Sequence, residues 1–381
     1  MFSARAVLVA VLVAFVGGLL VSLAVRTPGA SAGRLAPVAG EGGAPVRIHW
    51  RMPLSAPRNL PGSGETIIWL SQALKDTTDG AFVVDLYDPG EIVPAFAVTD
   101  AVRDRKVSAG YTWLGYDQGK IPSSPLIAAT PFGLEPWAYI GWWYFAGGRE
   151  LAEAVYAKHN MKPIFCAVTG PETAGWFREP LTAAEDINGL KIRFAGLGGR
   201  VMQRVGASIT MLPAGEIFQA LETGVIDATE FSQPLTDRAL GFSRIAKFNY
   251  YPGWHQPFSA THVVVNLDVW NEMRSSDQAL LEGLCTAGVA RNLGYSEAMQ
   301  GPIVRGLGDV GVSARALPDD LLARLRAAAN EVLDEEAGRD ADFATILASQ
   351  REFQEVYGEW RRLAFPPPTT RGNEGVPSEG S

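Results

Sequence analysis

The sequence GLKIRFAGLGGRVMQRVGASITML, residues 189–212, contains two short apolar runs separated by a glycine-rich turn and a helical pattern. Residues 191–194 and 208–212 have the length and composition of buried strands, and the apolar residues of 199–205 recur at the 3.6-residue spacing of a helix. A strand, a helix and a second strand in this order indicate a βαβ unit. The stretch therefore predicts an α/β protein with largely parallel sheets.

The same alternation continues on both sides of this stretch. Further strand-like runs lie at 47–52, 82–87, 109–113, 163–168, 226–231 and 261–266. Helical patterns lie at 66–75, 98–104, 148–159 and 215–223. The C-terminal third is helical, with long patterns at 276–299 and 318–333 and a polar helix that ends near residue 364.

The two ends of the chain differ from this folded body. Arg5 precedes an apolar stretch at 6–25, and Ala30-Ser31-Ala32 follows. This order is typical of a secretory signal, so residues 1–32 predict export to the periplasm. The apolar stretch is also long enough to span a bilayer, so an uncleaved membrane anchor is the alternative. The composition of 33–45 predicts a flexible linker, and that of 365–381 a disordered tail.

Composition limits the class of protein. With 381 residues, 47% of them apolar, the chain is long enough for two folded domains. Its 33 basic and 41 acidic residues leave a net charge of -8, which argues against nucleic acid as a partner. Cys166 and Cys285 are too few for a disulfide framework. One bridge and two buried thiols are both open, and the apolar run at 164–168 favours a simple buried side chain for Cys166.

Motifs of several enzyme classes are absent from the sequence. It has no G-x-S-x-G elbow, no H-E-x-x-H and no Walker loop, and it contains only four histidines. The turn at 196–199 resembles a dinucleotide-binding loop, but Val201 occupies the position of the third glycine. A nucleotide cofactor of that type is therefore not expected.

Arg193 lies inside an apolar strand-like run, between Ile192 and Phe194. A permanent cation there is costly to bury unless an anion pairs with it. Its planar guanidinium suits a ligand carboxylate, which it can grip through two parallel hydrogen bonds. A structural salt bridge to a protein carboxylate is an equally good interpretation.

Two glutamates follow strand-like runs. Glu230 ends the run at 226–231, at the edge where open α/β sheets place their ligand crevices, and Glu172 lies just past the run at 163–168. The pair predicts either a general acid and base or oxygen ligands for a hard cation. Because no nucleophile or histidine is near either one in sequence, the cation is the better use. Two solvated loop glutamates are the simplest alternative.

Trp254 follows a Pro-Gly turn in the segment Tyr250-Tyr251-Pro252-Gly253-Trp254-His255. Most of the ten tryptophans are expected in the core. A Pro-Gly turn is rigid and can aim an aromatic ring, so Trp254 is predicted to lie at a cleft.

Together these segments resemble the solute-binding subunits of tripartite ATP-independent periplasmic (TRAP) transporters, the DctP family. The similarity extends over most of residues 46–360, and two of the segments are similar to the subgroup that binds 2-oxo acids or similar small carboxylates. The segments that carry it are Gly175-Trp176-Phe177-Arg178, Gly189-Leu190-Lys191-Ile192-Arg193, Gly224 with Ile226-Asp227-Ala228-Thr229-Glu230, and Tyr250-Tyr251-Pro252-Gly253-Trp254.

The resemblance implies a two-lobed periplasmic binding protein-like fold, α/β in class, with hinge strands and a long connecting helix. Lobe I would comprise 46–165 and about 235–275, and lobe II 166–234 and about 276–345. A C-terminal helix would follow at 346–364. The ligand is expected in the crevice between the lobes, in a protein that performs no covalent chemistry.

The same resemblance implies roles for individual residues. Arg193 matches the arginine that clamps the substrate carboxylate, and Glu172, Trp254 and Tyr116 are expected to contact the substrate as well. A metal ion would be held by Glu172, Glu230 and the backbone carbonyl of Phe231. The subgroup usually has Gln at the position of Glu172 and Trp at that of Phe231. The extra carboxylate favours calcium, with sodium as the alternative.

Assembly is expected to depart from the subgroup, whose members commonly exchange a long C-terminal helix between two subunits. Here prolines at 366–368 follow Phe365, and consecutive prolines stop a helix. The chain is therefore predicted to be a monomer that works with TRAP membrane permease subunits.

Two other functions are weighed against transport: a metal-dependent lyase on the same scaffold with Glu172 as the base, and a ligand-sensing module.

Overall fold

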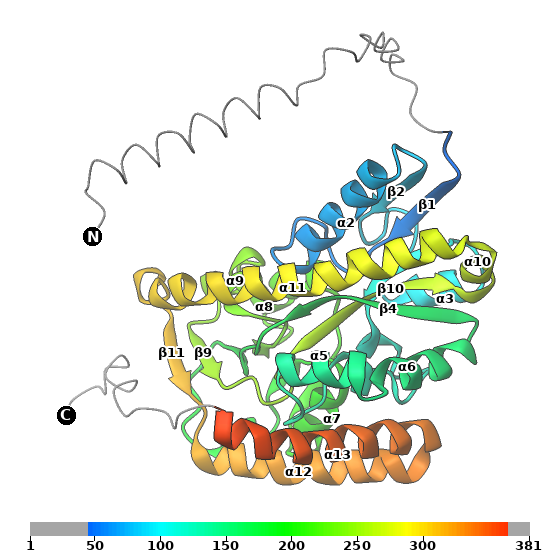
Figure 1. The fold of residues 1–381 in the computed structure, drawn as a ribbon. Helices are drawn as coiled ribbons and strands as arrows, with labels where there is room; N and C mark the ends of the chain where they lie inside the picture. The colour runs from blue at the N-terminus through cyan, green and yellow to red at the C-terminus, as the bar shows by residue number, and fades with distance from the viewer. Residues whose placement is uncertain (1–44, 365–381) are drawn as a thin grey trace, which may run out of the picture. The chain divides into compact units, whose positions relative to one another are not determined.

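The computed structural model describes residues 45–364, which form three β-sheets covered by helices (Figure 1). The first sheet pairs β1 (Ile48–Pro53) with β2 (Phe82–Tyr87) in parallel. α2 (Ser63–Thr77) connects them and buries its apolar face, so this unit is a βαβ crossover. The expected signal at 1–32, the expected linker at 33–45 apart from Pro45, and the expected tail at 365–381 lie outside the described residues.

The second sheet has the order β3-β10-β4, formed by β3 (Ala109–Trp113), β4 (Met161–Thr169) and β10 (Ser259–Asn266). β10 is antiparallel to both neighbours, so the expectation of largely parallel sheets is wrong for this part of the fold. The reason is the path of the chain. It leaves this sheet along β4 and returns along β10, and two strands that carry a chain out and back run in opposite directions.

The third sheet contains the βαβ unit of residues 189–212. Here β6 (Lys191–Arg193) and β7 (Ser208–Thr210) pair in parallel and α7 (Gly196–Arg204) connects them, as expected from the sequence. The sheet order is β11-β9-β5-β8-β6-β7. Its other strands are β5 (Gly175–Phe177), β8 (Ala228–Thr229), β9 (Phe248–Tyr251) and β11 (Ser313–Ala316).

Three segments pass between the second and third sheets. Residues 170–174 lead from β4 to β5, and residues 252–258 lead from β9 back to β10. The return is later than the residue of about 235 that the sequence predicted, because β9 belongs to the third sheet. The third segment is the long helix α11 (Ser275–Arg305), which lies along β4 and leads toward β11 (Figure 1).

α11 and β4 are covalently joined by a disulfide between Cys166 and Cys285. Both side chains are buried, as expected, but they pair, which corrects the interpretation of Cys166 as a simple buried side chain. Gly288 explains the close packing, because a Cβ atom there would lie 2.5 Å from the carbonyl oxygen of Cys166. The helix backbone can therefore approach the strand only with glycine at this position.

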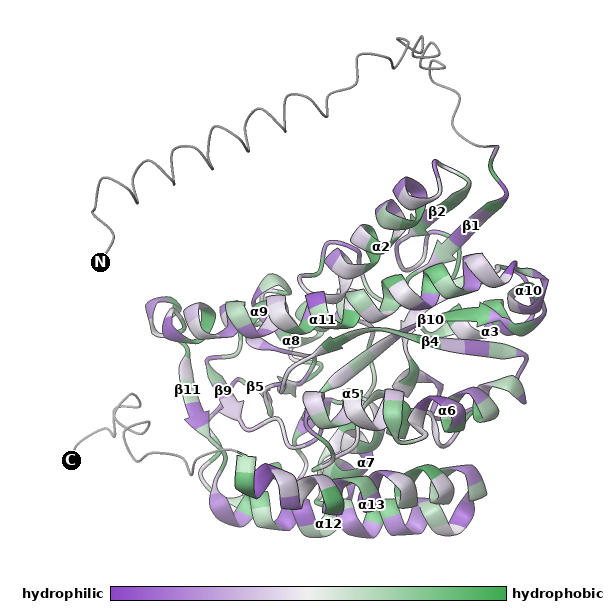
Figure 2. Ribbon diagram, in the orientation of Figure 1, coloured by the Kyte–Doolittle hydropathy of each residue, from purple (hydrophilic) through white to green (hydrophobic). Residues whose placement is uncertain are grey.

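The C-terminal helices form an antiparallel pair of α12 (Asp319–Arg339) and α13 (Ala341–Ala364) that alternates hydrophobic and hydrophilic residues (Figure 2). α13 begins five residues before the expected 346, because the Asp340 side chain accepts a hydrogen bond from the Phe343 N–H at 2.7 Å and so caps it. The other helices are α3 (Val98–Arg103), α4 (Ser124–Ala128), α5 (Pro136–Phe145), α6 (Gly148–Ala157), α8 (Ala214–Glu222), α9 (Pro234–Ala239) and α10 (Leu267–Glu272). Within residues 45–364, no helix is both long and apolar enough to cross a membrane.

Candidate functional site

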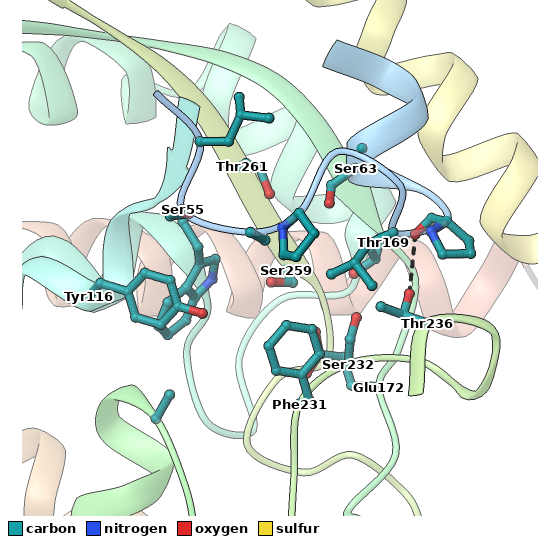
Figure 3. Close-up of a pocket in the computed structure, with 18 of the residues that line it drawn as sticks. Ser55, Ser63, Tyr116, Thr169, Glu172, Phe231, Ser232, Thr236, Ser259 and Thr261 are labelled. Carbon is teal, nitrogen blue, oxygen red and sulfur yellow. Dashed lines mark hydrogen bonds between the residues drawn. The ribbon is translucent and has the colours of Figure 1, made fainter. Parts of the chain in front are cut away.

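A cavity of about 70 Å³ lies where the sheets meet (Figure 3). Its walls come from the loop after β1, from the ends of β4 and β10, and from the ends of β6 and β8. Five of the residues singled out in the sequence line it: Tyr116, Glu172, Arg193, Glu230 and Phe231. The fold therefore brings together segments from six separate parts of the chain.

Arg193 lies at the end of β6 and is 1% exposed. Its Nη1 atom donates to the carbonyl oxygen and to Oε1 of Glu230, both at 2.7 Å, and its Nε donates to the Leu212 carbonyl at 3.1 Å. The structural salt bridge considered for Arg193 is therefore present. These bonds also fix the plane of the guanidinium and involve only Nε and Nη1; Nη2 makes no hydrogen bond within residues 45–364.

Glu230 follows β8 directly and is fully buried. Its Oε1 atom also accepts a hydrogen bond from the Ala195 N–H at the start of α7, at 2.7 Å. Burial opposes ionisation of this carboxyl, but Arg193 and His255 outweigh burial and lower the pKa of Glu230. Glu230 is therefore a carboxylate, and its Oε2 atom has no hydrogen-bond partner among the described residues.

Glu172 lies on the segment that leads from β4 to β5 and is 2% exposed. Its backbone N–H donates to the Gln256 carbonyl at 3.2 Å, which ties it to the segment that returns to β10. Burial raises the pKa of Glu172 to about 7, although His255 and Arg193 oppose this. Its Oε2 atom also has no hydrogen-bond partner within residues 45–364.

His255 is the residue that the sequence analysis did not assign. Its Nε2 atom lies 3.5 Å from Oε2 of Glu230 and 3.7 Å from Oε2 of Glu172, and all three side chains are 1% exposed. Burial opposes protonation of His255, but the two carboxyl groups outweigh it and raise the pKa of His255 to about 9. The only sequence signal was its position next to Trp254, because contact between the two crossing segments is a property of the fold.

The remaining expected residues divide between the cavity and the core. Tyr116 lies in the short helix Leu114–Asp117, and burial raises the pKa of its hydroxyl. The ring of Phe231 lies 5.2 Å from the Arg193 guanidinium. Trp254 is not among the residues that line the cavity: it is 3% exposed and stacks on Phe132 with ring centres 5.6 Å apart.

The site can be compared with known proteins. A family model, "Bacterial extracellular solute-binding protein, family 7" (DctP), matches residues 60–340. The chain belongs to this family. A relative from Nostoc sp. strain PCC 7120, a "monocarboxylate 2-oxoacid-binding periplasmic protein", is 31% identical over 318 residues, which cover 83% of this chain and 86% of the relative.

Solved structures extend the similarity to the fold. A TRAP transporter solute-binding protein from Bordetella bronchiseptica, with calcium and picolinate in its site, aligns at a TM-score of 0.82 and 28% identity, covering 84% of this chain and 95% of that one. A TRAP periplasmic solute-binding protein from Pseudoalteromonas atlantica, with sodium and pyruvate, aligns at 0.80 and 28%, covering 84% and 97%. The expected two-lobed α/β binding-protein fold is confirmed.

Membership in the family also decides between the classes of function. Family 7 proteins are solute-binding proteins, and the similar structures are transport receptors. The chain is therefore a solute-binding protein and not an enzyme, so the lyase alternative is not favoured.

Proposed function

We propose that this chain captures a small 2-oxo or 2-hydroxy monocarboxylate, together with a metal ion, outside the cytoplasm and delivers it to the permease subunits of a TRAP transporter. The observation that carries the proposal is the convergence of one cation and two unpartnered carboxylate oxygens on one small, buried cavity. A ligand that presents a carboxylate beside a second oxygen atom complements this arrangement.

In this proposal Arg193 binds the ligand carboxylate through Nη2, while its other nitrogens hold the guanidinium in place. Tyr116 lines the same cavity and supplies a hydroxyl. The cavity has room for about five water-sized groups, because one water requires roughly 10–15 Å³ on this measure. The ligand is therefore a monocarboxylate of few atoms.

The residues present suit a metal ion. Oε2 of Glu172 and Oε2 of Glu230 are buried acceptors that make no hydrogen bond within residues 45–364, and such atoms are costly unless a cation or ligand meets them. The Phe231 carbonyl, which accepts no hydrogen bond within the described chain, is the third oxygen of this group. A bound ion would hold the second ligand oxygen and balance the buried carboxylates.

Charge favours calcium over sodium. One arginine, two carboxylates and a monoanionic ligand sum to a charge of -2, and a divalent ion makes this group neutral when its binding displaces the proton of His255. Glu172→Gln removes one of the negative charges. We expect this variant to bind ligand with sodium in place of calcium rather than to lose binding, as calorimetry in each salt can establish.

A thermal-shift screen tests the proposal. Protein stripped of metal is mixed with pyruvate, lactate, propionate or succinate, each with and without calcium. Pyruvate or lactate with calcium should raise the melting temperature in proportion to ligand concentration over Kd. Propionate lacks the second oxygen and succinate is too long for the cavity, so both should act weakly. Equal responses to all four acids, or to none, would refute the proposal.

Two further features belong to the proposal. We place one lobe around the first two sheets and the other around the third, with residues 170–174, residues 252–258 and α11 as the connections that close the lobes on the ligand. We also propose export by the N-terminal signal at 1–32, with an uncleaved anchor as the alternative. The mass of the mature protein recovered from the periplasm separates the two forms.

A role in ligand sensing is the other alternative, and it would need a signalling partner instead of the permease.

A further inference from the structure

Three buried donor atoms face one another in the cavity wall: Oε2 of Glu172, Oε2 of Glu230 and Nε2 of His255. These side chains can each offer one atom such that all three lie within 4.8 Å of one another. The imidazole lies 3.5 Å and 3.7 Å from the two oxygens. Two atoms bound to one ion at about 2.1 Å are roughly 3 to 4 Å apart, so these positions suit a single ion.

Apart from its contacts with Glu172 and Glu230, the imidazole of His255 has no polar partner among the described residues. Neither ring nitrogen makes a hydrogen bond there, although the side chain is 1% exposed. A buried imidazole that makes no hydrogen bond is costly, and its contacts with the two carboxylates at 3.5 Å and 3.7 Å are longer than ordinary hydrogen bonds, so an atom that satisfies it is expected. The ring is also held in place, because Phe194 and Trp254 pack edge-on against it with ring centres 4.7 Å and 5.5 Å away.

Nitrogen changes the kind of ion that a site selects. Calcium and sodium take oxygen ligands, whereas imidazole together with carboxylates suits zinc, cobalt or manganese. The oxygen set of Glu172, Glu230 and the Phe231 carbonyl would alone favour a hard ion. A nitrogen donor on the same ion shifts the preference toward the transition metals.

We infer that His255 is a third metal-ligating side chain and that the site binds a divalent transition-metal ion more tightly than calcium. The inference rests on the metal ion of the proposed function and specifies its chemical class. It leaves the ligand clamp of Arg193 unchanged, because Arg193 contacts Glu230 through Oε1 and the three metal-facing atoms are others.

The test measures metal binding alone, without any carboxylate ligand. Protein stripped by chelation is titrated calorimetrically with Co²⁺ and with Ca²⁺, and the visible absorption of bound Co²⁺ is recorded. Wild type should bind one Co²⁺ at least tenfold more tightly than Ca²⁺. His255→Gln should lose about tenfold or more in Co²⁺ affinity and change the absorption bands, while Ca²⁺ affinity changes by less than about threefold.

A matched control is His49→Gln, which removes an exposed histidine of β1 that contacts Asp85 and should leave both affinities unchanged. Should His255→Gln not fold, pulsed electron paramagnetic resonance of Mn²⁺-loaded wild type replaces it and should detect nitrogen coupling from an imidazole. Unchanged Co²⁺ affinity in the variant, no nitrogen coupling, or tighter binding of Ca²⁺ than Co²⁺ by wild type each overturns the inference. Failure of wild type to bind any carboxylate would instead refute the proposed function, which is tested separately from the metal preference.

Discussion

The backbones of Gly253 and Glu172 are packed so closely that a Cβ atom at residue 253 would lie 2.2 Å from the Glu172 carbonyl oxygen. The two residues belong to the two segments that cross between the sheets. Glycine is therefore required for the contact that places His255 beside Glu172. The site depends on this contact as well as on its own side chains.

Gly253→Ala should separate the two segments. A new methyl group this close to a backbone atom cannot be accommodated by a side-chain movement, so we expect a loss of about 1–3 kcal/mol in the free energy of unfolding. Ligand affinity should fall too, because His255 and Glu172 move apart. Urea unfolding and calorimetry measure the two effects.

The matched control is Gly283→Ala in the exposed middle of α11, where a Cβ atom meets nothing within 4 Å. Alanine has a higher helix propensity than glycine, so the free energy of unfolding of this variant should rise by roughly 0.5–1 kcal/mol, and its ligand affinity should equal that of wild type. Wild-type stability and affinity in Gly253→Ala would show that the two crossing segments are not held by this contact.

Arg193→Lys should weaken carboxylate binding nearly as much as Arg193→Ala. A lysine ammonium cannot reproduce both the hydrogen bonds to Glu230 and Leu212 and a further bond to the ligand. The free energy of ligand binding should weaken by about 2–3 kcal/mol, measured by calorimetry with pyruvate and calcium. Arg204→Lys is the control, because the side chain of Arg204 lies at the surface, where it pairs with Glu331 of α12, and this variant should bind as wild type does. Full affinity in Arg193→Lys would exclude the proposed clamp.

Local patterns in the sequence predicted most strands and helices near their observed positions, because periodicity and turn residues are local properties. The opening stretch at 189–212 is one case. α5 was not predicted, since its apolar residues surround the helix and show no periodicity. β5, β9 and β11 were not predicted either.

The site was predictable only in part. Arg193 and Glu230 each stood out as charges in apolar runs, but the sequence did not indicate that they bind each other at 2.7 Å. His255 gave no signal of its own, because its proposed role depends on a contact between two segments that are far apart in sequence: residues 252–258, which lead from β9 to β10, and residues 170–174, which lead from β4 to β5. Pairing of Cys166 with Cys285 likewise follows from the packing of α11 on β4.

The buried His262 of β10 should make stability depend on pH. Burial lowers the pKa of His262 to about 3, since Phe165 and Trp143 surround it and neither ring nitrogen has a partner among the described residues. In the unfolded chain the pKa is about 6.5. The unfolded state therefore binds the proton first, and the contribution of His262 to stability is complete above pH 6.5 and is lost as the pH falls toward 3.

We expect protonation of His262 in the unfolded chain to lower the free energy of unfolding by about 1.4 kcal/mol for each pH unit below pH 6.5. His262→Phe has no ring proton to bind, so its urea-derived stability should fall less steeply than that of wild type between pH 6.5 and 4. Comparison with wild type removes the effect of the carboxylates, which both proteins share. Parallel pH profiles would mean that His262 stays charged or accessible in the fold.

Loss of the Cys166–Cys285 disulfide should destabilise the protein strongly. The two residues are 119 positions apart, and a closed loop of that size restricts the unfolded chain by an amount worth about 3–5 kcal/mol. The Cys166→Ala/Cys285→Ala double variant should show this loss in urea unfolding. A reducing agent should lower the stability of wild type to a similar value and leave the double variant unchanged. Insensitivity of wild type to reduction would contradict the prediction.

The protein should be a monomer, or at most a weak dimer, once the signal is removed. The prediction rests on the sequence, in which the consecutive prolines at 366–368 do not favour the longer C-terminal helix that could exchange between subunits. An apolar stripe of Val356, Trp360 and Leu363 is exposed on the last turns of α13. Three side chains on one helix cover much less than the roughly 800 Å² per subunit of a stable interface.

Size exclusion with light scattering at micromolar concentration decides the question, and we expect the mass of one chain for a protein that starts at residue 33. A two-chain mass that survives deletion of 365–381 would contradict the prediction. Trp360→Glu would then locate the interface, because a charge in the middle of the α13 stripe is costly to bury without a partner. If that variant dissociated, the stripe would be the dimer contact. If the variant stayed a dimer, another surface would form the contact, and the C-terminal helix would have no role in assembly.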